Sequence, residues 1–540
     1  MKLVTVSQMQ AIEKEADAGG LTYDQMMENA GQGLADIILS LYADDGEAEA
    51  VGLVGPGNNG GDTLVTLSAL AAEGWKARAY LVKRKKDDLV KRFLEAGGEV
   101  LTRENPFEQL AEAIETADVF LDGIFGTGIK LPLKKDIAEL LSEVNDVLDG
   151  LDALRGPLII AVDCPSGVDC DTGEVAEEAI AADLTVTMAA VKQGLLKLPA
   201  FEYVGDLEVV EIGLPADLSS FRDLKTEVAD EDSVSALLPE RALDSHKGTF
   251  GTALIAAGSV NYTGAVLLAG EAAYRAGAGL VTLAVPAPLH AALSGRFSEA
   301  TWVLLPHEMG VISRDAAEVF AKNIERATAL LLGPGFGMED TTKEFIENLL
   351  RGKVSSKRAA SRIGFVQPES EKKEETNSQL PAMIFDADGL KLLARIPDWH
   401  KLLPGHAILT PHPGEMSVLT GLSKEEIQAN RQEIAGRYAK EWGHVVILKG
   451  AFTIIAAPDG RLTVIPVASP ALARAGTGDV LAGLIVGLRA QGLEAFEAAV
   501  AGAWIHAQAG LYAADDLGTT TSVLAGDILD SISDVLSDLE

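Results

Sequence analysis

The chain has 540 residues, 47% of them hydrophobic and 23% charged, a balance that is typical of soluble globular protein and excludes disorder throughout. This length predicts more than one domain. With 80 acidic and 45 basic residues the formal net charge is −35, which argues against nucleic acid or an anionic membrane as a partner, because both bind basic surfaces.

The first half of the chain alternates short apolar runs with helical patterns. Residues 7–39 are expected to be helical, and because no strand precedes them they are expected to pack outside a sheet. A helical pattern also covers residues 63–73. The predicted strands lie at residues 51–54, 77–82, 119–121, 158–162 and 184–187. This alternation predicts a parallel sheet covered by helices on both faces, that is, a Rossmann-like three-layer α/β/α domain.

A segment rich in acidic and turn residues, 219–232, interrupts this pattern. We therefore expect one domain over residues 1–220 and a second α/β domain over residues 225–540. The second domain has predicted strands at residues 252–257, 280–285, 329–332, 383–385, 408–409 and 445–448 and predicted helices at residues 265–276, 480–490 and 495–513. Residues 351–380 are highly polar and lack apolar periodicity, so a flexible surface insertion is expected there rather than a binding arm.

The chain has only two cysteines, Cys164 and Cys170, which excludes a disulfide scaffold and favours a reducing compartment. Both thiols are expected to be buried and to take no part in catalysis. No apolar run reaches membrane-spanning length, and the first residues lack a signal-peptide core. The sequence therefore predicts a cytoplasmic protein without a membrane partner, and its apolar helices allow self-association into a homo-oligomer.

A glycine-rich segment marks the first candidate site. Residues 55–60 read Gly-Pro-Gly-Asn-Asn-Gly between a predicted strand and a predicted helix, as in the fingerprint whose backbone amides meet a pyrophosphate. The acidic residue that would hold a ribose hydroxyl is missing, because Lys83-Arg84-Lys85 stands at the end of the next strand. On this segment alone, a plain glycine-rich turn is the alternative.

Two later predicted strands end in loops of a similar kind. Residues 122–128 read Asp-Gly-Ile-Phe-Gly-Thr-Gly, and residues 163–169 read Asp-Cys-Pro-Ser-Gly-Val-Asp. Because an open parallel sheet binds its ligands at the carboxyl ends of the strands, the three loops are expected to converge. Oxygen ligands of this type suit a hard cation.

Together with Glu28-Asn29-Ala30-Gly31 and Lys192-Gln193-Gly194-Leu195, these loops resemble the NAD(P)H-hydrate epimerase family over most of the first 215 residues. The resemblance implies a substrate that is hydrated NADH or NADPH (NADHX or NADPHX), with C6 of the ring inverted by positioned proton transfer. It implies that the substrate contacts Asn58, Asn59, Gly60, Gly61, Asp62, Gly126, Thr127, Gly128, Ile129, Lys130, Leu131, Pro132 and Asp163. It implies a potassium ion on Asn59, Asp122 and Ser166.

Asp163 and Lys192 are the candidate catalytic residues of this site, because a carboxylate and an ammonium group that lie close together can exchange protons. The alternative for Lys192 is a clamp on the phosphates of the substrate. Thr63 stands where the family usually has glycine, and it is expected to narrow the mouth of the loop slightly.

The second candidate site is Gly476-Thr477-Gly478-Asp479, directly before a predicted helix. Free backbone amides and the positive end of the helix form an anion hole there. Asp479 can take a proton from a hydroxyl that attacks a phosphoryl group, although a helix N-cap is the alternative role for this residue. The chain has no Walker loop.

The region from about Glu240 to Gly510 resembles the ADP- or ATP-dependent NAD(P)H-hydrate dehydratase family, which has the ribokinase-like fold. Six ordered motifs carry the resemblance: His246-Lys247-Gly248-Thr249-Phe250-Gly251, Tyr262-Thr263-Gly264-Ala265, Gly333-Pro334-Gly335-Phe336-Gly337, Asp386-Ala387-Asp388-Gly389-Leu390, Thr410-Pro411-His412-Pro413-Gly414-Glu415 and Leu448-Lys449-Gly450-Ala451.

This second resemblance implies that ADP or ATP phosphorylates the C6 hydroxyl, which then leaves as phosphate, with Asp479 as the base and Mg²⁺ accompanying the nucleotide. It implies hydrated dinucleotide contacts at Ala265, Gly335, His412 and Asp479. It implies adenine nucleotide contacts at Lys449, Gly450, Ala451, Phe452, Thr453, Gly476, Thr477 and Gly478. The alternative for His412 is a cap on a turn of its proline-rich loop.

Other functions stay open from the sequence. The second domain could be a ribokinase-type small-molecule kinase, with a first domain that binds a dinucleotide without turnover. The glycine-rich segment at residues 55–60 and the basic Lys83-Arg84-Lys85 could instead belong to an NADP-dependent dehydrogenase, which leaves the second half unexplained. The sequence does not decide between ADP and ATP, or between NADHX and NADPHX.

Overall fold

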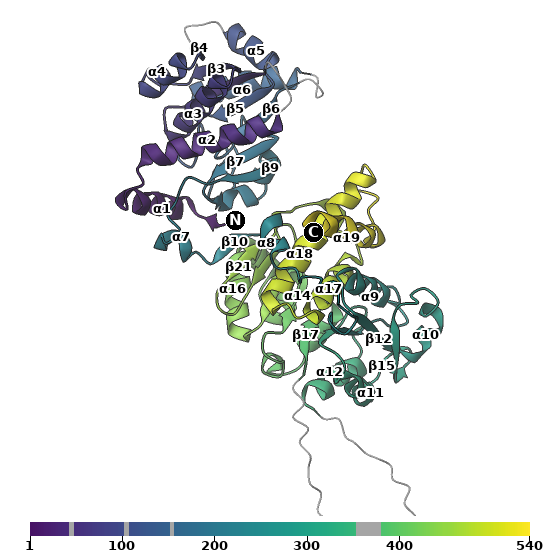
Figure 1. Cartoon of the computed structure of the whole chain (residues 1–540). Helices are drawn as coiled ribbons and strands as arrows, with labels where there is room; N and C mark the ends of the chain where they lie inside the picture. The colour runs from purple at the N-terminus through teal and green to yellow at the C-terminus, as the bar shows by residue number, and fades with distance from the viewer. Residues whose placement is uncertain (43–47, 102–106, 152–155, 353–379) are drawn as a thin grey trace, which may run out of the picture. The chain divides into compact units, whose positions relative to one another are not determined.

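The computed structural model describes residues 1–42, 48–101, 107–151, 156–352 and 380–540. These residues form two compact units, Met1–Val228 and Ala229–Glu540, whose elements are labelled in Figure 1. The insertion expected at residues 351–380 lies outside the described residues, apart from 351, 352 and 380. No helix in the described ranges is long and apolar enough to cross a membrane.

The described part of the first unit is built on a seven-stranded sheet whose neighbouring strands all pair in parallel. In spatial order the strands are β4 (Glu99–Leu101), β3 (Lys76–Leu81), β2 (Glu49–Val54), β5 (Val119–Gly123), β6 (Leu158–Val162), β7 (Leu184–Met188) and β9 (Asp206–Val210). After β2 the chain adds β3 and β4 on one side of it, and then β5, β6, β7 and β9 on the other side. Such a switch point opens a crevice at the carboxyl ends of β2 and β5.

The helices of this unit are α1 (Val6–Ala18), α2 (Tyr23–Leu41), α3 (Asn58–Ala72), α4 (Asp88–Glu95), α5 (Phe107–Glu115), α6 (Lys135–Asp149) and the short α7 (Ser219–Arg222), followed by strand β10 (Thr226–Val228). Alternate residues of the central strands face opposite sides of the sheet and so belong to two different apolar layers. Val54 and Leu121 belong to the layer under α1 to α4, whereas Leu53 and Phe120 belong to the layer under α5 and α6. This alternation gives the three-layer sandwich that Figure 1 shows.

The opening segment differs from the expectation in one respect. A strand, β1 (Leu3–Val4), does precede the helices, and it pairs in parallel with β8 (Val191–Lys192). The expectation that no strand precedes them is wrong, because a two-residue strand leaves no periodic pattern in the sequence. The helical stretch is also divided in two, with Thr5 and Thr22 closing the N-termini of α1 and α2 in capping boxes.

Helix α3 begins earlier than the predicted residues 63–73. Gly57 is its N-cap, so the Asn-Asn-Gly-Gly-Asp segment forms its first turns rather than a loop. The glycines of this segment serve close packing. A Cβ atom on Gly60 would lie 2.0 Å from the carbonyl oxygen of Gly55, and one on Gly61 would lie 2.5 Å from the sulfur of Met27. Hence α3 starts directly against the end of β2.

The strands that the second unit supplies follow the spatial order β21 (Leu462–Val464), β20 (Ile454–Ala456), β19 (Val445–Leu448), β18 (Ile408–Leu409), β17 (Ala382–Phe385), β16 (Ala329–Leu332), β11 (Thr252–Ala256), β12 (Leu280–Pro286) and β13 (Thr301–Leu305). Pairing is parallel from β19 to β13, whereas β20 and β21 form antiparallel pairs at one side. The switch point of this sheet lies between β11 and β16.

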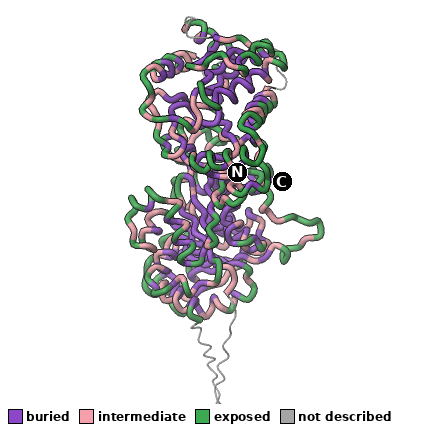
Figure 2. The backbone as a smooth tube through the Cα atoms, turned by 90° about the vertical axis from the view of Figure 1, so that its left-hand side faces the viewer, coloured by how far each residue is buried: buried purple, intermediate pink, exposed green. Residues whose placement is uncertain are grey.

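The remaining elements of the second unit are α8 (Glu231–Ser235), α9 (Ala265–Arg275), α10 (Ala287–Leu293), the hairpin β14 (His307–Glu308) and β15 (Val311–Ile312), α11 (Ala316–Ile324), α12 (Asp340–Leu350), α13 (Asp388–Leu393), α14 (Pro413–Thr420), α15 (Lys424–Ala429), α16 (Arg431–Trp442), α17 (Thr477–Ala490), α18 (Ala495–Asp516) and α19 (Ala525–Leu539). Figure 2 shows buried residues concentrated along the sheets and on the helix faces against them.

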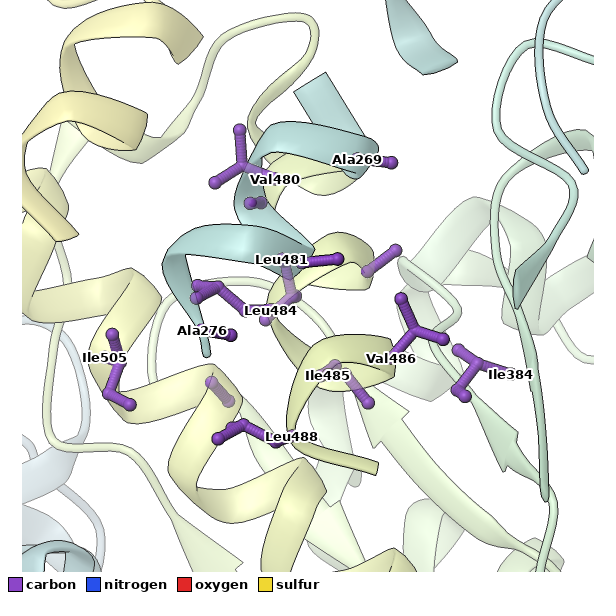
Figure 3. Packing of buried hydrophobic residues seen from close by; sticks show 14 of the residues in the cluster. Ala269, Ala276, Ile384, Val480, Leu481, Leu484, Ile485, Val486, Leu488 and Ile505 are labelled. Atoms are coloured by element: carbon purple, nitrogen blue, oxygen red, sulfur yellow. The ribbon is translucent and has the colours of Figure 1, made fainter. Parts of the chain in front are cut away.

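The core of the second unit centres on the contact of α17 with α9. A Cβ atom on Gly483 would lie 2.3 Å from the carbonyl oxygen of Ala269, so glycine lets the two helices approach closely. Figure 3 shows Leu484 and Leu488 of α17 and Ala276 of α9 in this cluster. The contact fixes the N-terminus of α17, which carries the second candidate site.

The α/β class predicted for both halves is confirmed. The predicted strands at residues 158–162, 329–332, 408–409 and 445–448 agree with β6, β16, β18 and β19 residue by residue. In the second unit, β13 to β15, β20 and β21 were not predicted, because they are short and form edges or hairpins with little apolar periodicity.

Candidate active sites

A pocket of about 460 Å³ opens in the first unit at the switch point between β2 and β5. The three loops expected to converge do so: Pro56 and Gly57, the stretch from Ile124 to Gly128, and Asp163 all line it. Helices α1 and α2 supply another part of the wall, with Met9, Glu13, Tyr23, Met26, Met27 and Ala30. The pocket therefore joins the carboxyl edge of the sheet to the opening helices.

Asp163 and Lys192 form an ion pair in the pocket. The Lys192 ammonium donates to Oδ1 of Asp163 at 2.5 Å and to Thr187 and the Met188 carbonyl at 2.9 Å each, and the side chain is 1% exposed. Burial opposes the ammonium charge, but Asp163 and the nearby thiols outweigh it and raise the pKa of Lys192. Lys192 is therefore held charged and immobile beside Asp163. The backbone of Asp163 has a left-handed φ of 66°.

Two more carboxyl groups line this pocket, Asp62 on α3 and Glu13 on α1. Burial and then the charges of Asp163 and Glu13 raise the pKa of Asp62 well above its usual range, and burial and then Asp163 raise the pKa of Glu13. The sequence interpretation did not include Glu13. The available signal was its place on the buried stripe of α1 beside Met9 and Ile12, where an acidic residue is unusual.

Asn59, which lines the pocket, lies near Asp122 and Ser166 through shared hydrogen bonds around Phe125. The backbone N–H of Ser166 donates to Oδ2 of Asp122 at 2.6 Å, and the Asn59 amide donates to the carbonyl oxygen of Phe125 at 2.9 Å. Within the described residues, Oδ1 of Asn59 and Oδ1 of Asp122 are buried oxygens without a hydrogen-bond partner. Burial outweighs the hydrogen bonds from Ser166 and raises the pKa of Asp122 to about 6. Unsatisfied oxygens of this kind fit a hard cation.

The other residues predicted to contact the substrate fall into two groups. Asn58, Asn59, Asp62, Gly126, Thr127, Gly128 and Asp163 line the pocket, and Gly60, Gly61, Ile129, Lys130, Leu131 and Pro132 are not among its lining residues. A Cβ atom on Gly126 would lie 3.0 Å from Oδ2 of Asp163, so glycine keeps this wall clear.

The expectation for Thr63 is wrong. Its side chain is fully buried, and its hydroxyl donates to the Asn59 carbonyl at 2.8 Å. A Cβ atom on Gly123 would lie 1.8 Å from this hydroxyl oxygen, so Thr63 packs against the glycines of the sheet. It does not narrow the mouth of the loop, because it faces the sheet from the first turns of α3.

The basic run at the end of β3 is engaged within the fold. Arg84 donates to the carbonyl oxygens of Gly55 and Gly57 at 3.1 Å each and to Asp87 at 3.0 Å, and Lys83 pairs with Asp136. These contacts brace the glycine segment. Arg84 is therefore not free to hold the 2′-phosphate that the dehydrogenase alternative requires.

Both cysteines are free and buried, as expected. Cys164 lies 3.8 Å from Oδ2 of Asp163. A hydrogen bond with Cys170, followed by burial, raises the pKa of Cys164, which keeps the thiol protonated.

The second site lies at the carboxyl edge of the other sheet. Gly476, at φ 94°, is the N-cap of α17, so Thr477, Gly478 and Asp479 form the first turn of this helix. The N-cap alternative for Asp479 is thus excluded. Burial, followed by the charge of Asp386, raises the pKa of Asp479 to about 7. A carboxyl group with this pKa changes protonation state near neutral pH, as a general base requires.

Lys449 lies directly after β19 and links the acidic side chains of the second site to the N-terminus of α17. Its ammonium group donates to Oδ1 of Asp386 at 2.7 Å and lies 3.8 Å from Oε2 of Glu415. A Cβ atom on Gly478 would lie 3.5 Å from it, so the amine faces the N-terminus of α17. The Lys449 ammonium group and the N-terminus of α17 together form a positively charged region. The sequence interpretation quoted Asp386 and Glu415 only as parts of motifs.

His412 caps helix α14. Its Nδ1 accepts hydrogen bonds from the backbone N–H groups of Gly414 and Glu415 at 2.9 and 3.2 Å. The Glu415 carboxylate accepts a hydrogen bond from the backbone N–H of His412. The capping alternative is therefore present in the structure. The ring edge with Nε2 lies 3.4 Å from Oε1 of Glu415, and the side chain is half exposed.

The remaining predicted residues of the second site lie in two places, one at Ala265 and Gly335 and the other in the turn after β19. Gly335, at φ 64°, approaches Ala265 so closely that a Cβ atom on it would lie 3.0 Å from the Ala265 methyl. Lys449 to Thr453 form the turn from β19 to β20, in which Thr453 donates to the Gly450 carbonyl. Phe452 is buried, which turns its ring into the protein.

Comparisons with known proteins cover both units. A family model described as NAD(P)H-hydrate dehydratase matches residues 253–534, and one described as YjeF-related protein N-terminus matches residues 23–194. A bifunctional NAD(P)H-hydrate repair enzyme of Moorella thermoacetica is 35% identical, and the match covers 100% of this chain and 97% of that protein. The Escherichia coli K12 protein of the same name is 30% identical, with 97% and 92% covered.

Two solved structures match the second unit. The ADP/ATP-dependent NAD(P)H-hydrate dehydratase of Bacillus subtilis, crystallised with ATP and Mg²⁺, is 29% identical with a TM-score of 0.47, covering 58% of this chain and 99% of that one. A ribokinase-like superfamily protein from Enterococcus faecalis is 23% identical with a TM-score of 0.46, covering 58% and 96%.

Proposed function

This chain belongs to the family of bifunctional NAD(P)H-hydrate repair enzymes, and we propose that each of its two activities occupies one of the two sites described above. The chain is an NAD(P)H-hydrate epimerase and an NAD(P)H-hydrate dehydratase. The observation that carries the division is that each unit has its own lysine–aspartate pair at the carboxyl edge of its own sheet, Lys192–Asp163 and Lys449–Asp386.

In the first unit the pocket at the switch point holds the hydrated ring of NADHX or NADPHX. Asn58, Thr127, Gly128 and Asp163 line this pocket. Inversion at C6 needs a proton delivered to the ring and one removed from it. The Lys192–Asp163 pair exchanges one of them, and the burial of Lys192 favours this role over a phosphate clamp.

Asn59, Asp122 and Ser166 are the proposed ligands of a potassium ion. The support is the pair of buried, unpartnered oxygens on Asn59 and Asp122, together with the absence of soft ligands from that set. When bound, the ion supplies a positive charge that stabilises the ionised form of Asp122 and fixes the loops carrying Phe125 and Ser166.

In the second unit Asp479 takes the proton of the C6 hydroxyl as its oxygen attacks the terminal phosphorus of ADP or ATP. The phosphorus–oxygen bond to the rest of the nucleotide breaks, and the amides of Thr477 and Gly478 with Lys449 stabilise the charge on the phosphoryl oxygens. The C6–O bond then breaks with loss of phosphate, and a proton leaves C5 as the ring double bond reforms.

The two edges flanking Asp479 carry the proposed contacts. Ala265, Gly335 and His412 face the hydrated dinucleotide, and Lys449 to Thr453 with Gly476 to Gly478 face the adenine nucleotide. Mg²⁺ supplies charge on the nucleotide phosphates when bound. The cytoplasmic location and the homo-oligomer stay predictions from the sequence.

The test uses both epimers of the hydrate with ADP or ATP, and follows the return of reduced dinucleotide absorbance. Recovery of both epimers is expected. Recovery of only one would leave the first unit without activity on this substrate. Phosphorylation of another alcohol without recovery would instead support the small-molecule kinase.

A further inference from the structure

The epimerase pocket contains a carboxyl group that the proposed chemistry leaves unused. Asp62 lines the pocket from α3 and is 8% exposed. Within the described part of the chain its carboxyl group neither accepts a hydrogen bond nor forms an ion pair. A buried polar group without a partner is costly unless a ligand satisfies it.

The charges around Asp62 do not balance. Asp163 and Glu13 both repel its negative form, and Glu13 likewise has no hydrogen bond or ion pair within the described residues. The lysine of the pocket, Lys192, already pairs with Asp163 at 2.5 Å. Arg84 also acts on Asp62, but it is hydrogen-bonded to Asp87 and to the carbonyl oxygen of Gly55.

Tyr23 also lines the pocket, from α2. The pocket thus holds three carboxyl groups against one ammonium group. Electrostatics of this kind keeps a proton on a buried carboxyl that has no cationic partner, as in sites where neighbouring acids take different protonation states.

We propose that Asp62 is the acid that protonates the C6 hydroxyl of the hydrated ring, and that Glu13 holds Asp62 in its protonated form. This inference rests on the proposed epimerase site and adds its second proton-transfer group. Asp62 is then a catalytic residue, and Glu13, which acts through Asp62, is a positioning residue.

The step balances as follows. The C6–O bond breaks as its oxygen takes the proton of Asp62 and leaves as water, while the N1 lone pair forms a double bond to C6. Water then adds to the opposite face of C6 and gives a proton to the Lys192–Asp163 pair, and the N1 lone pair is restored. Proton exchange with solvent resets the two groups, so that only the configuration at C6 changes.

The experiment measures epimer exchange of a single purified epimer without nucleotide, so that the second unit cannot consume the product. Asp62→Asn keeps the size of the side chain and removes the acid, and kcat should fall by about 100-fold or more. Asp17→Asn is the matched control, since Asp17 is exposed on α1 one turn beyond Glu13. It should leave exchange unchanged.

Glu13→Gln tests the positioning role through the pH profile. Loss of the Glu13 charge makes Asp62 lose its proton at lower pH, so the alkaline limb of the profile should move down by about half to one pH unit. A purely structural role would lower kcat at all pH values without moving the limb.

Denaturant unfolding of the same variants reports whether the first unit is folded, and their dehydratase activity reports the second unit. If wild type exchanges epimers and Asp62→Asn keeps its rate, or if Glu13→Gln leaves the alkaline limb in place, the inference is wrong while the proposed function stands. If wild type itself does not exchange epimers, the proposed function of the first unit fails.

Discussion

The two units use a lysine–aspartate pair in opposite ways. In the first, Lys192 pairs at 2.5 Å with Asp163, the candidate catalytic carboxylate itself. In the second, Lys449 pairs at 2.7 Å with Asp386, and the candidate base Asp479 stands beside the pair. The lysine therefore contacts the candidate carboxylate directly in one site, and in the other it pairs with a different carboxylate next to the candidate base.

This difference shows how similar residues serve different chemistry. Asp479 keeps a pKa of about 7 because burial and Asp386 outweigh the nearby Lys449. It can thus hold the proton of a hydroxyl during phosphoryl transfer. At the same time the Lys449 ammonium faces the helix end, where phosphate charge is expected.

The largest effect is expected for Asp479→Asn. The dehydratase rate should fall about 1,000-fold, because the base for phosphoryl transfer is lost, while epimer exchange stays at the wild-type rate. The folded state holds the Asp479 proton more tightly than the unfolded chain, so wild-type stability falls as pH rises from about 4 to 7. Asp479→Asn should therefore melt at a higher temperature than wild type at pH 8. A lower melting temperature, or loss of both activities, would contradict this account of Asp479.

Lys192→Met should lower epimer exchange by about 100-fold and destabilise the first unit by about 3–5 kcal/mol, because Asp163 is left buried without its partner. Denaturant unfolding and the exchange assay measure both effects. Adding Asp163→Asn, which tolerates the left-handed backbone at this position, should restore part of the stability but not the activity. If Lys192→Met exchanges epimers normally, the lysine is only structural.

The pH dependence of dehydration should follow Asp479. Only the ionised carboxylate accepts a proton, so kcat/KM should fall about tenfold per pH unit below a midpoint near 7 and level off above it. Asp388 also raises this pKa, and Asp388→Asn should shift the midpoint to lower pH. A flat profile between pH 5 and 8 would show that Asp479 is not the base.

The smallest effect separates the two roles of His412. His412→Asn preserves an N-cap side chain, whereas His412→Ala removes it at a cost of about 1 kcal/mol to the helix. If His412 also contacts the hydrated dinucleotide, both variants should raise KM several-fold. A normal KM in His412→Asn with reduced stability only in His412→Ala would leave the cap as its whole role.

The sequence predicted the sheets well because their strands are apolar, buried on both faces and bounded by glycine or aspartate. β16 and β19 were predicted to the residue. It also predicted that three loops meet at one edge of the first sheet, which the pocket confirms, and the candidate pair that it named, Asp163 and Lys192, lies together there.

Other features depend on tertiary contacts that a single sequence does not encode in its pattern. Glu13 is part of the pocket only because α1 folds over the sheet edge. The side chain of Thr63 is buried because α3 starts early. The pKa of Asp479 depends on Asp386, nearly a hundred residues away along the chain.

The central claim is that one unit supplies the epimer that the other consumes. The dehydratase is expected to use the S epimer, so the most direct measurement supplies purified (R)-NADHX with ADP to Asp479→Asn, to Lys192→Met, and to an equal mixture of the two. Each variant alone should return little NADH beyond a blank without enzyme, whereas the mixture should return nearly all of it, because the epimer passes through solution. Failure of the mixture, or full recovery by Lys192→Met alone, would contradict two separate sites with these residues.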